Sequence, residues 1–399
     1  MPPWSAVAPG TDLSTHARVL SRVHDAVLAG GRPPVRPRGV VERSWSRVLG
    51  LGLDPDRPRP RDPLPADAVE GRRHGSGLAL VVDELRRVLV GVADASHGLV
   101  VVTDADGVVL WREGAAATRR HADRLGFAEG ATWTEAAVGT NAIGTALAEA
   151  APVQLFSAEH FESAQHPWYC SAAPVHSPVT GELLGIVDVS GPALTLHPAI
   201  GALVETSVRL AESGLWRRHE QHLERLRRSA EPVLGTVRGP LLVVDDDGWV
   251  AARSGIAAGP RVAVPRAGRP VAVPGLGLCT PERLGEGWLL RPAESRAPVT
   301  AELDLTAAPV LRVAGGQDSW SAALTRRQGQ VLALVAGAGR RGLDAAALGR
   351  GLYGDDGHVV AARAEVSRLR RVVGDLVSTG PYRLADGVAL TVRTGPGDG

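Results

Sequence analysis

Residues 78–111 read LALVVDELRRVLVGVADASHGLVVVTDADGVVLW and contain the two periodicities from which the fold can be inferred. Up to residue 94 the apolar residues recur every three to four positions, which predicts a helix. Two apolar runs follow at 99–103 and 108–111, separated by the sequence DADG. An Asp-Gly turn between such runs is typical of a β-hairpin. The stretch therefore predicts an antiparallel sheet with a helix packed on it.

The segments on either side extend this pattern of helices and strands. A short helix is expected at 140–149 and a long one at 197–228, with a break at Gly214 left open. Further strands are expected at 153–156, 169–174 and 183–190. On the N-terminal side we expect helices at 12–30 and 40–49, followed by a proline-rich linker at 54–65.

The composition is that of a globular chain of two or three domains. Of the 399 residues, 44% are hydrophobic and 22% are charged, which are ordinary globular values. The net charge is +1, but it is unevenly distributed. Residues 78–216 carry 7 Arg and 16 acidic residues, a net charge of −9, whereas residues 320–393 carry 11 Arg and 6 acidic residues, a net charge of +5. An acidic middle and a basic C-terminal segment predict separate tasks.

All 44 basic residues are arginine. The absence of lysine excludes a Walker A nucleotide-binding loop, a protein kinase and pyridoxal-phosphate chemistry, because each requires a lysine. The G-x-S-x-G elbow of the α/β-hydrolases is also missing. We therefore expect neither an enzyme nor a cofactor.

The sequence predicts a cytoplasmic protein with no membrane partner. No apolar run approaches the roughly 20 residues of a membrane-spanning helix. The N-terminus lacks the basic region and apolar run of a signal peptide. Two cysteines, Cys170 and Cys279, cannot form a disulfide framework, which favours a reducing compartment.

Residues 236–313 predict a small β-rich domain. Short strands are expected at 241–244, 249–250, 262–264, 271–273 and 288–290. The run of three aspartates at 245–247 is interpreted as a hairpin turn. A metal site is the alternative, but no second carboxylate cluster supplies the remaining ligands. The role of this segment stays open between a degenerate sensor of the PAS type and a spacer.

Residues 320–393 predict three helices followed by a hairpin. Thr325 and Gln328 have the spacing of a capping box at the start of the first helix. The second and third helices are expected at 343–352 and 358–373. A hairpin is expected to pair residues 382–384 with 389–392, and residues 394–399 are expected to form a disordered tail.

The third of these helices is amphipathic. Its apolar face consists of Val359, Ala362, Val366, Leu369 and Val373. The opposite face is small and basic, and the major groove of DNA accepts a helix whose arginines read guanine edges. The residues expected to contact double-stranded DNA are Arg363, Ala364, Ser367, Arg368, Arg370, Arg371 and, on the hairpin, Arg383. The alternative is a solvated arginine face in another small domain.

Two motifs in this segment resemble the winged-helix effector domain of the OmpR type. Residues 365–371, reading EVSRLRR, and the hairpin after them resemble its recognition helix and wing. Residues 348–354, reading LGRGLYG, resemble its second helix and turn. The resemblance implies DNA binding. The sheet that precedes the helices in that type is not evident, unless strands within 300–313 supply it.

Four motifs in the middle of the chain resemble the GAF sensor domain of acetoin-catabolism-type transcriptional activators. They are VGTNAIGTAL at 138–147, AEHF at 158–161, HPWYCSAAP at 166–174 and TGELLGIVDVSG at 180–191. Residues 12–54 resemble the helical lead-in of that family. The resemblance implies a domain that senses a small molecule or a redox signal, without specifying the ligand.

A pocket with aromatic walls and few polar groups suits such a ligand. The candidate pocket residues are Trp133, Thr140, Asn141, His160, His166, Trp168, Tyr169 and Cys170. Structural roles remain the alternative: Thr140 and Asn141 could cap a helix, and Trp168 and Tyr169 could belong to the core. No metal is expected, because the two histidines and Cys170 match no zinc-binding spacing.

The activators that this segment resembles usually continue into an ATPase domain, for which this chain has no Walker lysine. The resemblance therefore implies a regulator whose sensor acts directly on a DNA-binding domain. The expected fold is multidomain α+β: a GAF domain of antiparallel sheet and flanking helices, a small β-rich domain and a C-terminal winged helix-turn-helix. The expected divisions are 1–77 (lead-in and linker), 78–228 (GAF domain with its exit helix), 236–313, 320–393 and the tail.

The sequence also suggests partners other than an effector and DNA. The leucine-rich helix at 197–228 predicts a homodimer. A signalling adaptor that binds a protein such as a sigma or anti-sigma factor is the alternative function. A GAF-type methionine-sulfoxide reductase is not favoured, because that chemistry needs two cysteines and this segment has only Cys170.

Overall fold

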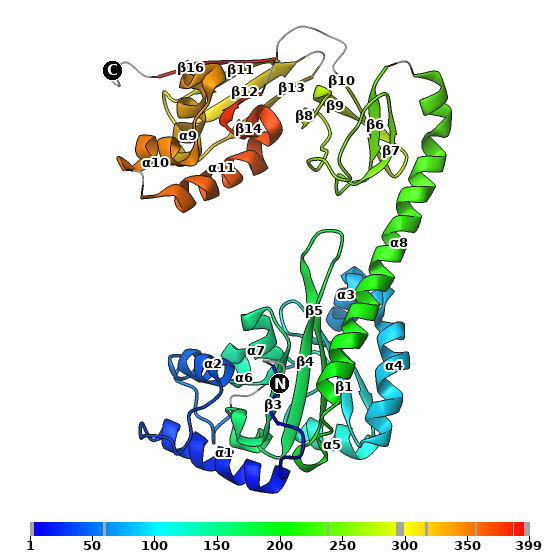
Figure 1. Ribbon diagram of the computed structural model, residues 1–399, viewed down its shortest axis with the longest axis vertical. Coiled ribbons are helices and arrows are strands. Elements are labelled where there is room, and N and C mark those ends of the chain that lie inside the picture. The colour runs from blue at the N-terminus through cyan, green and yellow to red at the C-terminus, as the bar shows by residue number, and fades with distance from the viewer. Residues whose placement is uncertain are drawn as a thin grey trace. The chain divides into compact units, whose positions relative to one another are not determined.

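The computed structural model describes residues 4–58, 61–237, 239–292, 299–315, 318–355, 357–385 and 387–394. The chain forms two units, Met1–His219 and Glu220–Gly399, and each combines largely antiparallel sheet with helices (Figure 1). The fold is therefore multidomain α+β, as predicted. Within the described residues no helix is both long and apolar enough to cross a membrane. Most of the expected tail, residues 395–399, lies outside the described residues.

The first unit is built on a five-stranded antiparallel sheet in the order β2-β1-β5-β4-β3. Its strands are β1 (Leu99–Asp104), β2 (Val109–Gly114), β3 (Val153–Phe156), β4 (Trp168–His176) and β5 (Leu183–Pro192). The predicted hairpin of β1 and β2 is confirmed. All residues from Leu99 to Val102 are buried. Because successive side chains of a strand point to opposite faces, both faces of the sheet must be covered.

Helices cover the two faces of this sheet (Figure 1). Val100 and Val102 share a core with residues of α4 (Val82–Ala95) and α8 (Ile200–Thr236). Leu99 and Val101 share the other core with residues of α1 (Leu13–Leu28), α2 (Gly39–Leu49) and α7 (Ala142–Glu149). The expected lead-in is therefore not a separate segment: Trp45 of α2 is buried in this second core.

The helices of the first unit differ from the prediction in several places. The helix expected at 78–94 begins as a 3-10 turn, Gly77–Leu80, and continues as α4. The question of a break at Gly214 is resolved, since α8 is continuous through that residue and extends to Thr236. Three helices were not predicted: α3 (Ala66–Gly75), α5 (Ala116–Arg124) and α6 (Glu135–Val138). Each has at most two buried side chains, so their sequences lack a helical apolar period.

The second unit begins with the β-rich segment. Its antiparallel sheet has the order β7-β6-β10-β9-β8. The strands are β6 (Leu241–Val244), β7 (Val250–Ser254), β8 (Val271–Val273), β9 (Gly277–Leu284) and β10 (Gly287–Pro292). The strand expected at 262–264 is wrong, and β9 was not predicted. Prolines at 260 and 265 bracket the expected strand, and proline cannot donate to a β-ladder.

The rest of the second unit is a four-stranded sheet with three helices. The sheet, ordered β13-β12-β11-β16, consists of β11 (Val299–Asp304), β12 (Val310–Gly315), β13 (Asp318–Ala323) and β16 (Val388–Arg393). The helices are α9 (Arg326–Gly337), α10 (Ala345–Tyr353) and α11 (Val359–Val373). The capping box at α9 is confirmed, because Thr325 and Gln328 exchange hydrogen bonds of 2.9 and 3.2 Å.

Two sequence predictions for this region are corrected. The boundary between residues 313 and 320 divides a sheet, because β12 pairs with β13 and β11 pairs in parallel with β16. The expected hairpin of 382–384 with 389–392 is also wrong. Instead β15 (Tyr382–Leu384) pairs with β14 (Val377–Thr379), and β16 joins the sheet. Local turn signals cannot reveal that a strand pairs with a distant one.

The first prediction concerns Gly139, which ends α6 with a φ of 75°. A Cβ at this position would lie 2.6 Å from Phe161 Cδ1. Gly139→Ala should lower the free energy of unfolding of the first unit by about 2–4 kcal/mol, from backbone strain and overpacking together. Gly181 has a similar φ of 79°, but a Cβ there would meet no described atom within 4 Å. It is the matched control, and Gly181→Ala should cost about 1 kcal/mol. Urea unfolding measures both variants. Equal losses of unfolding free energy in Gly139→Ala and Gly181→Ala would show that contact with Phe161 does not add to the cost.

Candidate nucleic-acid interface and sensor core

The apolar face of α11 packs against the core of its own domain. Ala362, Val366, Leu369 and Val373 are buried as predicted, whereas Val359 is only half-buried. These side chains share one cluster with residues of α9, α10, β11 and β12. The opposite side of the helix faces outward, so its arginines are held on a rigid element.

The arginines of α11 differ in what they contact. Arg363 and Arg371 are exposed and form no ion pair within the described part of the chain. Arg368 forms an ion pair with Glu365 at 2.6 Å, one helical turn earlier, and this hydrogen bond raises the pKa of Arg368. Arg370 is half-buried. Arg363 and Arg371 are therefore exposed arginines of the helix that no carboxylate within the described residues neutralises.

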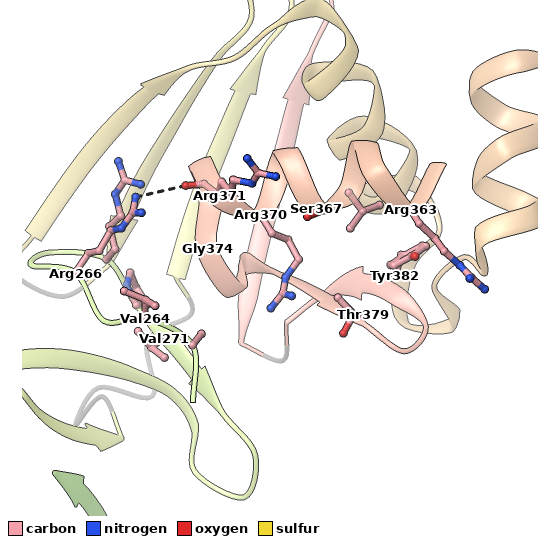
Figure 2. Close-up of a pocket in the computed structure, with 14 residues that line it drawn as sticks. Val264, Arg266, Val271, Arg363, Ser367, Arg370, Arg371, Gly374, Thr379 and Tyr382 are labelled. Carbon is pink, nitrogen blue, oxygen red and sulfur yellow. Dashed lines mark hydrogen bonds between the residues drawn. The ribbon is translucent and has the colours of Figure 1, made fainter. Parts of the chain in front are cut away.

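The structure brings four of the seven predicted DNA-contacting residues around one cavity of about 430 Å³ (Figure 2). These are Arg363, Ser367, Arg370 and Arg371. Ala364, Arg368 and Arg383 do not line it. Arg383 lies on β15, half-buried, with its Nη1 3.4 Å from the carbonyl oxygen of Leu384.

Two arginines of the β-rich segment, Arg266 and Arg269, line the same cavity and were not predicted. Arg269 Nη1 donates a 2.9 Å hydrogen bond to the carbonyl oxygen of Val372. Arg266 Nη1 lies 3.5 Å from the carbonyl oxygen of Arg371, a contact drawn as a dashed line in Figure 2. The last carbonyls of a helix lack partners within it and carry its negative end. The arginine-proline sequence of 265–270 signals a loop but not this contact.

Val360 is a further residue that the sequence reasoning did not select. It is 80% exposed near the start of α11. At about 100° per residue it falls between Ser367 and Arg371 on the helical wheel. The helical period places it on this exposed face, but a valine in an apolar run is ordinarily assigned to the core.

In the first unit, Thr140 and Asn141 have structural roles. Asn141 Oδ1 accepts a 2.9 Å hydrogen bond from the amide of Gly144, which caps α7, and its Nδ2 donates to the carbonyl of Gly139 at 2.9 Å. Thr140 Oγ1 lies 2.7 Å from the hydroxyl of Ser44 on α2. Both residues are buried, and Thr140 links α2 to the segment before α7, whereas Asn141 stabilises the start of α7 itself.

The sheet separates Tyr169 from its predicted neighbours. One core contains Trp133 and Trp168, and Cys170 packs against it. Tyr169 belongs to the core on the opposite face of the sheet. Alternate residues of a strand point to opposite faces, so Tyr169 cannot line a cavity together with Trp168 and Cys170. Grouping adjacent strand residues in one pocket was therefore wrong for Tyr169.

Two buried imidazoles, His24 and His160, lie close to the half-buried imidazole of His166, and His24 was not predicted. Burial lowers the pKa of His160 and of His166 to about 4, so both are neutral at pH 7. His24 of α1 lies edge-on to His166, with 4.7 Å between ring centroids. No cluster of histidine, cysteine and acidic side chains in the described ranges has a metal-binding arrangement.

A buried polar group lies on the face of the sheet that Trp168 shares. Ser190 Oγ lies 3.1 Å from Cys170 Sγ and donates a short hydrogen bond to Asp188 Oδ2. Burial raises the pKa of the Asp188 carboxyl to about 7 and that of the Cys170 thiol well above its usual value. Cys170 is therefore a thiol at neutral pH, and a thiol is a poor nucleophile. Asp188 lies within a motif recognised from sequence but was not selected.

Asp188 generates the second prediction. Its raised pKa means that, between pH 3.8 and about 7, the folded state keeps a proton that the unfolded state loses. Wild-type stability therefore falls through this window as the pH rises. Asp188→Asn removes that loss. As the pH increases from 4 to 7, the free energy of unfolding of the variant minus that of wild type should therefore increase by up to about 4 kcal/mol. Calorimetric unfolding of both proteins across this range measures the difference.

The control for this prediction is Asp94→Asn, because Asp94 is exposed. Its stability relative to wild type should be constant across the same range. A constant difference for Asp188→Asn as well would show that Asp188 is ionised in the folded protein.

Comparisons with known proteins find similarity to transcriptional activators. Residues 22–210 match the family model described as the MimR N-terminal domain. An uncharacterised 47.3 kDa protein in the thcA 5' region of Rhodococcus erythropolis is 39% identical over 220 residues, 53% of this chain and 50% of that protein. The acetoin dehydrogenase operon transcriptional activator AcoR of Bacillus subtilis is 34% identical over 57% of this chain and 36% of that protein.

A third relative is the propane 2-monooxygenase operon transcriptional activator MimR of Mycolicibacterium smegmatis. It is 32% identical over 182 residues, 45% of this chain and 30% of that protein. The chain thus spans half or less of the length of these three relatives. The solved E. coli DhaR(N)-DhaL complex aligns with a TM-score of 0.45 and 16% identity over 63% of this chain and 99% of that chain, a similarity too low to assign a common fold.

Proposed function

We propose that this protein is a cytoplasmic transcriptional regulator. Its first unit, a GAF-type domain, senses a small molecule or a redox signal, and its C-terminal domain, a winged helix, binds double-stranded DNA. The observation that carries the proposal is α11, whose buried apolar face fixes an outward face bearing Arg363, Ser367, Arg368 and Arg371. The domain around it has the order of three helices and flanking strands expected for such a reader.

The relatives support the regulatory part of this proposal. Two of them are named as transcriptional activators of the acetoin dehydrogenase and propane 2-monooxygenase operons. The matched family region, 22–210, corresponds to the first unit. DNA binding by the C-terminal domain is therefore inferred from α11 and from its charge.

The outward face of α11 suits the major groove. Arginine forks bind guanine edges and phosphates, and small residues such as Ala364 and Ser367 allow close approach. Val360 would supply the apolar contact that recognises a thymine methyl group. Arg383 would contact the DNA backbone beside the groove.

The third prediction tests this face. Arg371→Ala and Arg368→Ala should each weaken binding to the gene's own upstream DNA by about 1–3 kcal/mol. Arg371 is already accessible, whereas Arg368 must first leave Glu365. Fluorescence anisotropy with the full chain at two salt concentrations measures the affinity, and wild-type binding should weaken steeply with salt because phosphate contacts release counterions.

Arg120→Ala is the control for these variants, because Arg120 is exposed on α5, outside both the C-terminal domain and the proposed dimer helix. Its DNA affinity should equal that of wild type. Unchanged affinity in both α11 variants would overturn the choice of reading face. No DNA binding by a folded wild-type chain would favour the adaptor function instead.

We also propose that the protein acts as a homodimer through α8, so that a ligand shifts the arrangement of two DNA-binding domains. Part of the leucine stripe is used within the chain, since Leu215 and Leu226 are buried, but Leu210 is 38% exposed. The fourth prediction is that the wild-type chain is a dimer at micromolar concentration and that Leu210→Asp shifts it toward monomer. Light scattering measures both, and a monomeric wild type would contradict the proposal.

A further inference from the structure

The cavity beside α11 has a one-sided charge. Its described lining contains five arginines, three from α11 and two from the β-rich segment, and no acidic residue. The five are Arg266, Arg269, Arg363, Arg370 and Arg371. A concave site lined by one sign of charge concentrates ions of the opposite sign. The lining therefore favours an anion.

Two of these cations contact the end of α11, and a third is half-buried on that helix. Arg269 is held by the carbonyl of Val372 and by the ring of Trp320, whose centroid is 5.3 Å from its guanidinium carbon. Arg266 is exposed, and its Nη1 lies 3.5 Å from the carbonyl oxygen of Arg371. Arg370 is half-buried on α11 and extends toward the cavity in Figure 2. Preorganised guanidinium forks bind phosphate or carboxylate with less loss of side-chain entropy.

The rest of the lining is apolar or carries hydroxyl groups. Val264, Pro270, Val271 and Val366 supply the apolar surface, and Ser367, Thr379 and Tyr382 supply the hydroxyls. The volume of about 430 Å³ is within the range of small-molecule sites. A bare inorganic ion would leave the apolar surface unused, whereas an organic anion would cover it.

We propose that this cavity binds a small organic anion, a phosphate or carboxylate group attached to an apolar body, between the β-rich segment and α11. Arg266, Arg269 and Arg370 would bind the oxyanion, and Val264, Val271 and Val366 would contact the apolar body. This assigns the β-rich segment a binding task. The site also shares Arg363, Ser367 and Arg371 with the proposed DNA-reading face. A bound anion would therefore compete with DNA, a consequence that rests on the proposed function.

The test uses isothermal titration of the full chain, without DNA, with phenyl phosphate and with inorganic phosphate. Phenyl phosphate should bind saturably at one site per chain and at least about tenfold more tightly than inorganic phosphate, since burying its ring is worth more than about 1.4 kcal/mol. Arg266→Gln and Arg370→Gln should each weaken phenyl phosphate binding tenfold or more. Val264→Glu should do the same by repulsion, and it is safe for folding because Val264 is 47% exposed.

Arg341→Gln is the matched control, because Arg341 is an exposed arginine of the same unit outside the cavity. It should leave the affinity for phenyl phosphate unchanged. Absence of saturable binding, or equal affinities in wild type, Arg266→Gln and Val264→Glu, would overturn the proposal. Equal affinities for phenyl phosphate and inorganic phosphate would overturn the proposal that the site binds an apolar body attached to the anion.

A second arm separates this site from the proposed DNA function. Saturating phenyl phosphate should weaken DNA binding by wild type but not by Val264→Glu, whose site is blocked. The chain could bind phenyl phosphate with the expected variant pattern and yet not bind DNA. That result would support the anion site and overturn the proposed DNA-binding function. If the wild-type chain does not bind phenyl phosphate but Arg266→Gln loses DNA affinity, the anion site is overturned. Arg266 would then be assigned as a contact to the DNA backbone.

Discussion

The layered architecture of the first unit depends on one constraint, the burial of β1 and β5 on both faces of their sheet. The side chains from Leu99 to Val102 are all buried, and strand geometry sends them alternately to opposite sides. Neither face can remain in water, because exposing these side chains would cost about 1.5–3 kcal/mol each. One layer of helices on each face is the solution. The N-terminal helices are therefore part of the unit rather than an appendage, and the matched family region accordingly begins inside α1.

Buried polar contacts then determine how the N-terminal helices attach. Glu135 accepts hydrogen bonds from Ser44 at 2.6 Å and from Arg47 at 2.7 Å, and both donors lie on α2. Glu159 accepts from Arg38 at 2.7 Å, just before α2 begins. Removing one partner of such a buried pair leaves an uncompensated charge, which is far more costly than losing an exposed pair. Thr140 contributes to the same attachment through its contact with Ser44, and Asn141 caps α7.

In the second unit the corresponding role belongs to the pairing of β11 with β16. This parallel ladder joins the start and the end of the C-terminal domain and encloses the three helices between them in sequence. Parallel strands require a long connection, and here the connection contains β12, β13, the helices α9 to α11, and the strands β14 and β15. The stiffness of this frame allows α11 to expose arginines on one side while burying Leu369 and Val373 on the other. One side of α11 therefore carries the exposed charges, and the other side packs in the core.

Periodicity in the sequence was sufficient for elements whose signal is local. The hairpin of β1 and β2, the capping box at Thr325 and the buried stripe of α11 follow from apolar spacing and turn residues within a few positions. Contacts between distant segments had no such signal. The placement of Tyr169 behind the sheet, the pairing of β16 with β11, and the approach of Arg266 and Arg269 to the end of α11 were decided only by tertiary structure. The physical reason is that strand register, sheet order and the partners of buried polar groups depend on which surfaces meet, and a chain reveals those surfaces only when it is folded.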